Sequence, residues 1–208
     1  MKEYHKIKTV FERDPETKFK TLIHGQFSKP EFEYLADNIW EFTEKVDGTN
    51  IRIMWDGEKV VFGGRTDRAQ LYAPLVEVLS GYFYSGAMSE CFDSPNVCLY
   101  GEGFGAKIQK VGENYLNETV DFTLFDVNID GAWLSRDQVE DISATLQIGV
   151  VPIIGEGTLY DAIEVCKTGF DSRWGNFPAE GIVARPKIEM LDRRGHRIIT
   201  KIKCKDFL

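Results

Sequence analysis

Long hydrophobic runs are absent from this chain of 208 residues. A membrane-spanning helix needs about 20 consecutive apolar residues, and no stretch of the sequence approaches that length. The first residues, MKEYHKIKTVFERD, are charged where an export signal would need an apolar core. We therefore expect a protein that has no membrane association and is not exported.

Cysteine and histidine are scarce, with 4 and 3 residues respectively. The cysteines are Cys91, Cys98, Cys166 and Cys204. Because no two of them form a CxxC pair, we expect small buried hydrophobic residues rather than zinc ligands. None of the histidines adjoins a Gly-x-Ser-x-Gly turn, so a Ser-His-Asp hydrolase is poorly supported.

Internal repeats, low-complexity tracts and long Pro/Gly linkers are also missing. The hydrophobic content of 43% and the charged content of 28% are ordinary for a globular protein. We therefore predict a single domain over residues 1–208, which is long enough to bury its own core.

Positive charge is in deficit, because the formal net charge is −8. Taken alone this argues against nucleic-acid binding, since phosphate contacts require Lys and Arg. Residues 185–205, however, carry eight Lys or Arg against two acids, a local charge of +6 that leaves −14 for the remainder. This segment could face a polyanion, and a solvated β-hairpin with one charged face explains it equally well.

Short strand-like segments dominate the apolar content. They cover residues 50–55, 59–65, 97–103, 121–129, 181–187 and 197–205. Helical periodicity is found at 71–83, 135–147 and 158–170, and the pairs Ser135/Gln138 and Thr158/Asp161 have capping-box spacing. Because strands and helices do not alternate regularly, we predict an α+β fold with mixed antiparallel β-sheets and peripheral helices.

Charged residues stand at five predicted strand ends, where a fold can hold a few charges in fixed geometry. They are Lys45 in EKVDGTN, Arg65 in FGGRT, Glu102 in LYGEGFG, Glu180 in AEGIVAR, and Lys201 with Lys203 in TKIKCK. Each has an ordinary explanation by itself. Lys45 would be a charge beside a turn, and Lys201 with Lys203 would form an exposed strand face.

Together these side chains suit attack by a lysine on a nucleotide phosphate. A lysine amine with its ordinary pKa of about 10.4 is almost wholly protonated at neutral pH, and it loses its proton more readily beside other cations or when desolvated. Lys201 and Lys203 would supply that field or bind phosphate oxygens. Glu102 and Glu180 would hold a hydrated Mg²⁺ or a sugar hydroxyl, because Mg²⁺ prefers few protein oxygens and many waters.

The segment KVDG at 45–48 resembles the KxDG nucleophile motif of the covalent nucleotidyltransferases, which include ATP-dependent DNA ligases, RNA ligases and mRNA capping enzymes. Four further segments resemble motifs of that superfamily in the same order. They are LYGEGFG (motif III), DFTLFDV (motif IIIa), EGIVAR (motif IV) and KIK (motif V). The ordered set implies the nucleotidyltransferase fold, an ATP-grasp-like ligase adenylation domain.

The residues around the lysine bear on the branch of this superfamily. EKVDGTN is similar to the motif of phage-type RNA ligases that seal nicks in duplex RNA, which often reads EK-x-HGTN. The spacings of 20 residues from Lys45 to Arg65 and of 21 from Glu180 to Lys201 also resemble those ligases. Asp47 stands where they commonly carry His, and Asp is typical of DNA ligases. The resemblance favours an ATP-dependent RNA ligase, with a DNA ligase as the alternative.

The resemblance also implies roles for the matching residues. Lys45 would attack the α-phosphate of ATP to form lysyl-AMP and release pyrophosphate, and Glu180 would position Mg²⁺ or Mn²⁺. Glu44, Asn50 and Arg65 would contact the nucleotide or the donor phosphate, and Glu102 would contact the ribose. Phe125, or Phe122 on the opposite strand face, would stack on the adenine. Lys201 and Lys203 would contact the α-phosphate. The AMP would then pass to a 5′-phosphate end, from which a 3′-hydroxyl displaces it.

The implied partner is nicked or broken RNA, with DNA or a hybrid duplex as further options. We expect a monomer in the cytoplasm, or in the host cytoplasm if the protein is viral. Relatives carry an additional C-terminal OB or helical domain, and we expect none here. A capping guanylyltransferase, which would use GTP, and a non-catalytic module that binds nucleic acid through residues 185–205 stay open as alternatives.

Overall fold

The computed structural model describes residues 3–207, which form two compact units with separate hydrophobic cores. Unit 1 consists of residues 3–5 and 47–151, and unit 2 consists of residues 6–46 and 152–207. Within this described part, no helix has the length and apolar character needed to cross a membrane. The α+β fold is confirmed, and the single domain over residues 1–208 stays a prediction.

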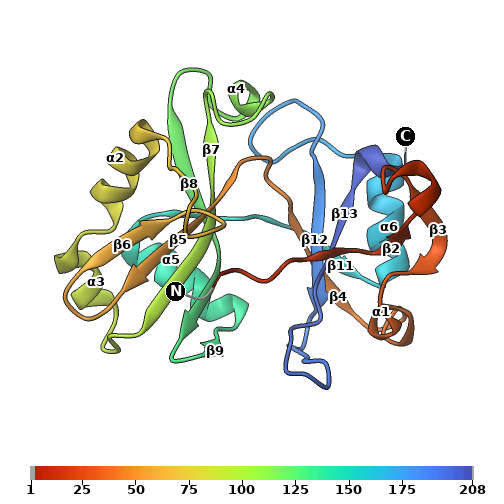
Figure 1. Cartoon of the computed structure of the whole chain (residues 1–208), viewed down its shortest axis with the longest axis horizontal. Coiled ribbons are helices and arrows are strands. Elements are labelled where there is room, and N and C mark those ends of the chain that lie inside the picture. The colour runs from red at the N-terminus through yellow and green to blue at the C-terminus, as the bar shows by residue number, and fades with distance from the viewer. Residues whose placement is uncertain (1–2, 208) are drawn as a thin grey trace. The chain divides into compact units, whose positions relative to one another are not determined.

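Unit 1 is built around a six-stranded sheet (Figure 1). The strand order is β10 (Gly149–Val150), β8 (Val120–Ile129), β7 (Val97–Gly105), β5 (Thr49–Trp55) and β6 (Val60–Gly63), while β9 (Ala132–Trp133) pairs with β8. All of these pairings are antiparallel except that of β10 with β8. The four strands predicted between residues 50 and 129 are confirmed, although β6 ends two residues before Arg65.

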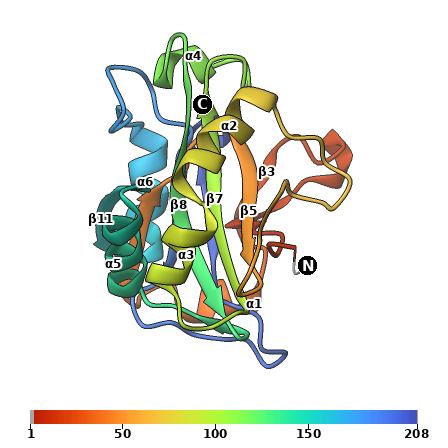
Figure 2. The same cartoon turned by 90° about the vertical axis from the view of Figure 1, so that its left-hand side faces the viewer.

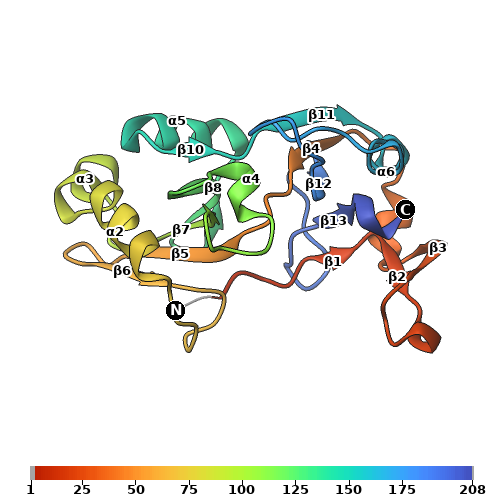
Figure 3. The same ribbon diagram turned by 90° about the horizontal axis from the view of Figure 1, so that it is seen from above.

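Helices cover one face of this sheet, as Figures 2 and 3 show for α2 (Ala73–Tyr82), α3 (Ser85–Cys91) and α5 (Arg136–Leu146). Leu79 of α2 belongs to the same buried core as Ile51 and Ile53 of β5. Because side chains alternate along a strand, Asn50 and Arg52 lie on the opposite face. The short helix α4 (Gly112–Tyr115) packs against β7.

Unit 2 contains a five-stranded sheet. Its order is β1 (Lys8–Thr9), β13 (Thr200–Lys203), β12 (Gly181–Pro186), β4 (Trp40–Glu44) and β11 (Ile153–Gly157), antiparallel except for β1 with β13. Helix α6 (Leu159–Thr168) packs against this sheet. The unit also contains α1 (Pro30–Tyr34), a hairpin of β2 (Phe11–Arg13) and β3 (Leu22–Phe27), and 3₁₀ turns at Pro15–Thr17 and Cys204–Asp206.

Local sequence signals located the longer elements well and the shorter ones poorly. The predicted helices appear as α2, α5 and α6, and both predicted capping boxes are present. The strand predicted at 197–205 is shorter, because only Thr200–Lys203 pairs with β12 and the chain then turns into a 3₁₀ helix. Cys166 and Cys204 are buried as predicted, whereas the other two cysteines are only half-buried.

Gly101 occupies an irregular point of the β7–β8 pairing, where the register shifts. A Cβ atom at this position would lie 2.2 Å from Cζ of Phe122 and 2.3 Å from the carbonyl oxygen of Thr123. Phe122 is 1% exposed and packs edge-to-face against Phe83, with ring centroids 5.4 Å apart. The missing side chain at residue 101 therefore lets β7 lie directly against a core ring.

We expect Gly101→Ala to lower the free energy of unfolding by about 1–3 kcal/mol, because the Phe122 ring and the Thr123 carbonyl must move to admit a methyl group. Urea unfolding of the whole chain measures this loss. Gly149→Ala, in the same sheet, is the matched control, since its Cβ would meet no atom closer than 3.7 Å. Equal urea midpoints for the two variants would contradict the steric explanation.

Candidate functional site

Three of the sequence-predicted residues meet in unit 2. The Glu180 carboxylate contacts Lys45 Nζ through Oε2 at 2.6 Å and Lys203 Nζ through Oε1 at 2.5 Å. The exposed fractions of the side chains are 22% for Lys45, 11% for Glu180 and 21% for Lys203. One carboxylate thus holds two lysine side chains in a partly shielded setting that small solutes can still reach.

The strand order of unit 2 produces this cluster. Lys45 directly follows β4, and its backbone N–H donates to the Gly181 carbonyl at 2.9 Å. Gly181 is in turn the register partner of Lys203 across β12 and β13. On β13 the residues Thr200 and Ile202 are buried and the two lysines between them are not, so Lys201 and Lys203 share a face as predicted.

Ionisation of Glu180 is favoured by its neighbours. Burial acts to raise its pKa, but the charge of Lys45 and the hydrogen bonds from Lys203 and Lys45 outweigh burial and hold the pKa below its ordinary value. The side chain is therefore a carboxylate at neutral pH. It supplies negative charge between two cations that would otherwise repel each other.

Glu44 is placed differently from the other predicted residues. Its side chain is 1% exposed, and its Oε2 accepts a hydrogen bond from the Arg173 backbone N–H at 2.8 Å. Burial raises the pKa of Glu44 more than its hydrogen bonds with Arg173 and Ser172 lower it. The carboxylate holds the loop at 171–179, which leads into Glu180, and its contact with a nucleotide or donor phosphate stays a prediction.

The remaining predicted residues belong to unit 1. Asn50 of β5 and Glu102 of β7 are direct register partners on the face of the sheet opposite the helices. The Oδ1 atom of Asn50 is buried and has no hydrogen-bond partner among residues 3–207. Arg65 is exposed and lies two residues after the end of β6, at the edge of the same sheet.

The two candidate adenine-stacking residues of β8 have separate environments. Phe122 is enclosed in the core of unit 1, below Gly101. Phe125 is half-buried outside that core and lies edge-to-face with Tyr4, with ring centroids 5.1 Å apart. The Tyr4 hydroxyl also donates to the carboxylate of Asp126. Of the two rings, Phe125 is therefore the one with a surface outside the core, and its stacking on adenine stays a prediction.

Arg52 belongs to none of the sequence motifs, although strand alternation predicts which face of the sheet it occupies. It stands two residues after Asn50 in a strand of alternating character, which places it on the same face. The side chain is 0% exposed and bonds to the loop that carries Arg65. Tyr4, by contrast, has no signal in the sequence, because only the fold brings it to β8.

Ion pairs neutralise much of the positive charge at residues 185–205. At least four of the eight cations are bound to acidic side chains, in the pairs Arg185–Glu41, Lys187–Glu156, Arg197–Glu189 and Lys203–Glu180, with distances of 2.5–3.1 Å. The segment does form a hairpin, since β12 and β13 are antiparallel neighbours. Its charge is thus a weaker argument for a polyanion surface than its composition indicates.

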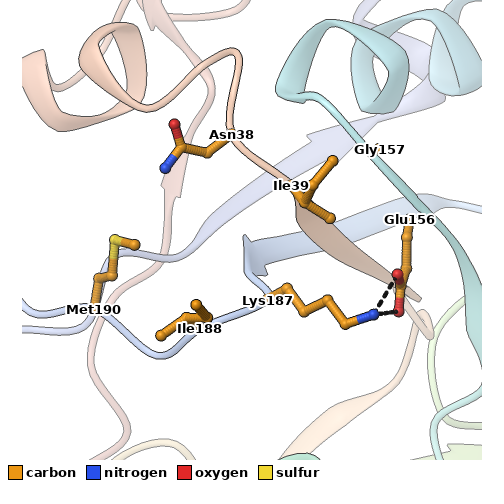
Figure 4. A pocket seen from close by; sticks show the side chains of 7 residues that line it. All are labelled: Asn38, Ile39, Glu156, Gly157, Lys187, Ile188 and Met190. Atoms are coloured by element: carbon orange, nitrogen blue, oxygen red, sulfur yellow. Dashed lines mark hydrogen bonds and ion pairs between the residues drawn. The ribbon is translucent and has the colours of Figure 1, made fainter.

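Unit 2 also has a pocket of about 620 Å³, shown in Figure 4. It is lined by Asn38, Ile39, Glu156, Gly157, Lys187, Ile188 and Met190, and Lys187 is ion-paired with Glu156 at its rim. Strand register places this pocket near Trp40 and Pro186, whereas Lys45 adjoins the other end of β4. At about 3.3 Å per residue the two ends are about 15 Å apart, so the pocket is distinct from the lysine cluster.

A metal cage made only of side chains is not found in the described residues, since no group of three or more His, Cys, Asp or Glu is suitably arranged. Glu180 offers a single carboxylate. A hydrated Mg²⁺ or Mn²⁺ takes few ligands from the protein, and it would share this carboxylate with the amines of Lys45 and Lys203. The metal role of Glu180 stays a prediction.

Comparison with solved structures first defines the class of fold. The Naegleria gruberi RNA ligase with PPi matches with a TM-score of 0.68 and 20% identity, covering 86% of this chain and 53% of that chain. A variant of the same ligase with ATP and Mn matches with a TM-score of 0.70 and 17% identity, covering 96% and 55%. A variant with AMP and Mn gives 0.67 and 18%, covering 84% and 52%. These likenesses identify an RNA ligase nucleotidyltransferase-type fold.

The family follows from the sequence match. The family model described as RNA ligase matches residues 38–203, and the chain belongs to the RNA ligase family. None of the curated proteins compared with the chain matches it. The chain spans about half the length of the solved ligase structures, as the coverage of 52–55% shows.

We expect acidification to remove a stabilising contribution of Glu180. Its pKa in the folded chain lies below the ordinary value of 4.5. The contribution is therefore complete above that value and is lost as the pH falls through the lower pKa of the folded state. Between about pH 6 and about pH 3, wild type is expected to lose more free energy of unfolding than Glu180→Gln in urea titrations.

Glu164→Gln is the control for this pH dependence, because its exposed pair with Lys167, at 3.3 Å, contributes little. We expect this variant to follow wild type across the pH range. Identical pH dependences of wild type and Glu180→Gln would contradict the role given to the lysine pair.

Proposed function

We propose that this protein is an ATP-dependent RNA ligase that acts through a covalent lysyl-AMP intermediate. The cluster of Lys45, Glu180 and Lys203 carries the proposal, because it presents a lysine amine within 2.6 Å of an ionised carboxylate in a member of the RNA ligase family. The Naegleria ligase structures that contain ATP, AMP or PPi support a nucleotide as the substrate.

The chemistry proceeds in three transfers. Lys45 Nζ, after losing its ammonium proton to solvent, attacks the α-phosphorus of ATP. A P–N bond forms, the bond from that phosphorus to the α–β bridging oxygen breaks, and pyrophosphate leaves with that oxygen. A 5′-phosphate oxygen of RNA then attacks the same phosphorus and releases the lysine. Finally a 3′-hydroxyl attacks the activated 5′-phosphate, forms the phosphodiester and releases AMP.

The residues around Lys45 would position the amine and balance charge. Glu180 orients the amine through Oε2, and Lys203 and Lys201, on the same face of β13, stabilise negative charge on the α-phosphate. Glu180 would also hold Mg²⁺ or Mn²⁺, which when bound neutralises charge on phosphate oxygens. Most of the catalytic effect in such phosphoryl transfer comes from positioning and electrostatics.

Unit 1 would bind the nucleoside and the donor phosphate. Glu102 would accept hydrogen bonds from the ribose hydroxyls, and Phe125 would stack on the adenine ring. Asn50 and Arg65 would contact phosphate oxygens of the nucleotide or of the donor end. The buried, unsatisfied Oδ1 of Asn50 supports a ligand on this face of β5.

The substrate is proposed to be nicked or broken RNA, and the protein is proposed to act as a monomer in the cytoplasm. Membership in the RNA ligase family supports RNA over DNA. A DNA or hybrid duplex is the second candidate, because Asp47 stands at the position where similar RNA ligases commonly have His.

We expect wild-type protein incubated with α-labelled ATP and Mg²⁺ to acquire a covalent label that survives a denaturing gel. Lys45→Ala is expected to abolish the label, because it removes the proposed attacking amine. Lys187→Ala is the matched control, because it removes another lysine–glutamate pair of unit 2, at 2.6 Å, from the far end of β12. Label in Lys45→Ala, or none in wild type, would overturn the mechanism.

We expect the protein to seal nicks in duplex RNA faster than matched nicks in duplex DNA. The comparison uses one sequence prepared as RNA, DNA and hybrid duplexes, with sealing followed by gel electrophoresis. Preferential sealing of the all-DNA nick would favour the DNA ligase alternative. Covalent labelling by GTP in place of ATP would instead indicate a capping guanylyltransferase.

A further inference from the structure

Arg52 is a fully buried cation on the sheet of unit 1, with 0% of its side chain exposed. Removing a charged group from water is unfavourable unless hydrogen bonds and opposite charge compensate for it. The strand β5 directs Arg52 to the same face as Asn50, away from the helices. A buried guanidinium on the face proposed to bind a nucleotide therefore calls for a specific function.

Two hydrogen bonds of Arg52 go to the loop that carries Arg65, while its Nη1 is buried and has no hydrogen-bond partner among residues 3–207. Its Nε donates to the Gly64 carbonyl at 2.7 Å, and its Nη2 donates to Asp67 Oδ1 at 2.9 Å. The two anchors bracket Arg65 in the sequence, one immediately before it and one two residues after it. The fork of Arg52 thus holds the backbone before Arg65 through the Gly64 carbonyl, and the segment after Arg65 through the side chain of Asp67.

The local sequence provides space for this arrangement. Gly63 is the register partner of Arg52, and a Cβ there would approach Nη2 to 3.4 Å. Beyond Arg65 the chain turns back, with the Ala69 N–H donating to the Thr66 carbonyl at 3.1 Å. The guanidinium of Arg52 therefore links this loop to β5 of the sheet.

Geometry matters more than charge in this contact. Asp67 is 59% exposed, so solvent screens much of its attraction to Arg52. Gly64 is buried, so solvent screens the hydrogen bond from Arg52 to its carbonyl much less. Arginine presents several N–H groups in a rigid plane and can reach both anchors at once, whereas the single ammonium of a lysine cannot reproduce the fork.

We propose that Arg52 is a positioning residue that holds Arg65 in place for its contact with the phosphate. The proposal rests on the proposed function, in which Arg65 binds the nucleotide or the donor phosphate. Arg52 itself acts through the loop and not on the reacting atoms.

A double-mutant cycle tests this role. Rates of lysyl-AMP formation and of AMP transfer to a 5′-phosphorylated RNA are measured for wild type, Arg52→Lys, Arg65→Ala and the double variant. We expect Arg52→Lys to slow the step that Arg65→Ala slows, by about 10- to 100-fold. Both changes remove the same contact, that of Arg65 with the phosphate. The double variant is therefore expected to be no slower than Arg65→Ala. Additive losses, or a wild-type rate for Arg52→Lys, would overturn the proposal.

Arg136→Lys is the matched control. Arg136 also lies in unit 1 and also donates to one carboxylate and one backbone carbonyl, those of Glu140 at 2.7 Å and Val151 at 2.8 Å, but its bonds do not involve the Arg65 loop. We expect wild-type rates for this variant. A second variant, Asp67→Asn, keeps an oxygen acceptor at an exposed position and is expected to slow the same step by a smaller factor than Arg52→Lys.

Amide hydrogen exchange separates this proposal from the proposed function. The Ala69 amide donates to the Thr66 carbonyl inside this loop. Arg52→Lys is expected to accelerate its exchange by about 10-fold or more, and Arg136→Lys is expected to leave it unchanged. This readout requires neither ATP nor RNA. If exchange is faster in Arg52→Lys but the wild type forms no lysyl-AMP, the ligase function is refuted and the loop contact is supported. Unchanged exchange in Arg52→Lys would refute the positioning role.

Discussion

The carboxylate of Glu180 is the contact on which the candidate site depends. It lies between Lys45 and Lys203, which are far apart in the sequence. One carboxylate oxygen contacts the Lys45 amine at 2.6 Å, and the other contacts the Lys203 amine at 2.5 Å. Two cations so close together would repel each other without it, and a partly buried carboxylate would be costly without them. The arrangement is possible only because β4, β12 and β13 are neighbours in one sheet. A change in the strand order would therefore abolish the site as well as the fold.

Each unit uses one face of its main sheet for stability and leaves another for polar groups. In unit 1 the helices cover the face that carries Ile51 and Ile53, while Asn50 and Arg52 occupy the other face. In unit 2 Ile202 joins the core, and the lysines that flank it on β13 point away from it. The period-2 alternation of a strand makes this division automatic. The apolar side chains of the buried face stabilise the fold, and the side chains of the polar face are available for binding and catalysis.

This division explains how a fold can be shared at 17–20% identity with the Naegleria RNA ligase structures. Core positions accept many apolar residues of suitable volume. The proposed chemistry requires only a few charged side chains at strand ends, and the order of strands keeps them in register. The chain passes from unit 2 to unit 1 between Val46 and Asp47, within the KVDG segment. Only four residues of the chain therefore lie between the proposed nucleophile Lys45 and the predicted phosphate ligand Asn50.

The amino-acid sequence was sufficient for the class of fold, the main strands and helices, and the order of Lys45, Glu102, Glu180 and Lys203, because periodicity and motif spacing are local properties of the chain. It also showed that Lys201 and Lys203 share a strand face. It did not reveal that Glu44 is turned toward a loop, that Arg52 holds the residues around Arg65, or that at least four cations of the basic hairpin are bound in ion pairs. These features arise from strand register and burial, which join residues distant in sequence. Long-range pairing leaves no periodic trace in a single chain, so only the tertiary structure could decide them.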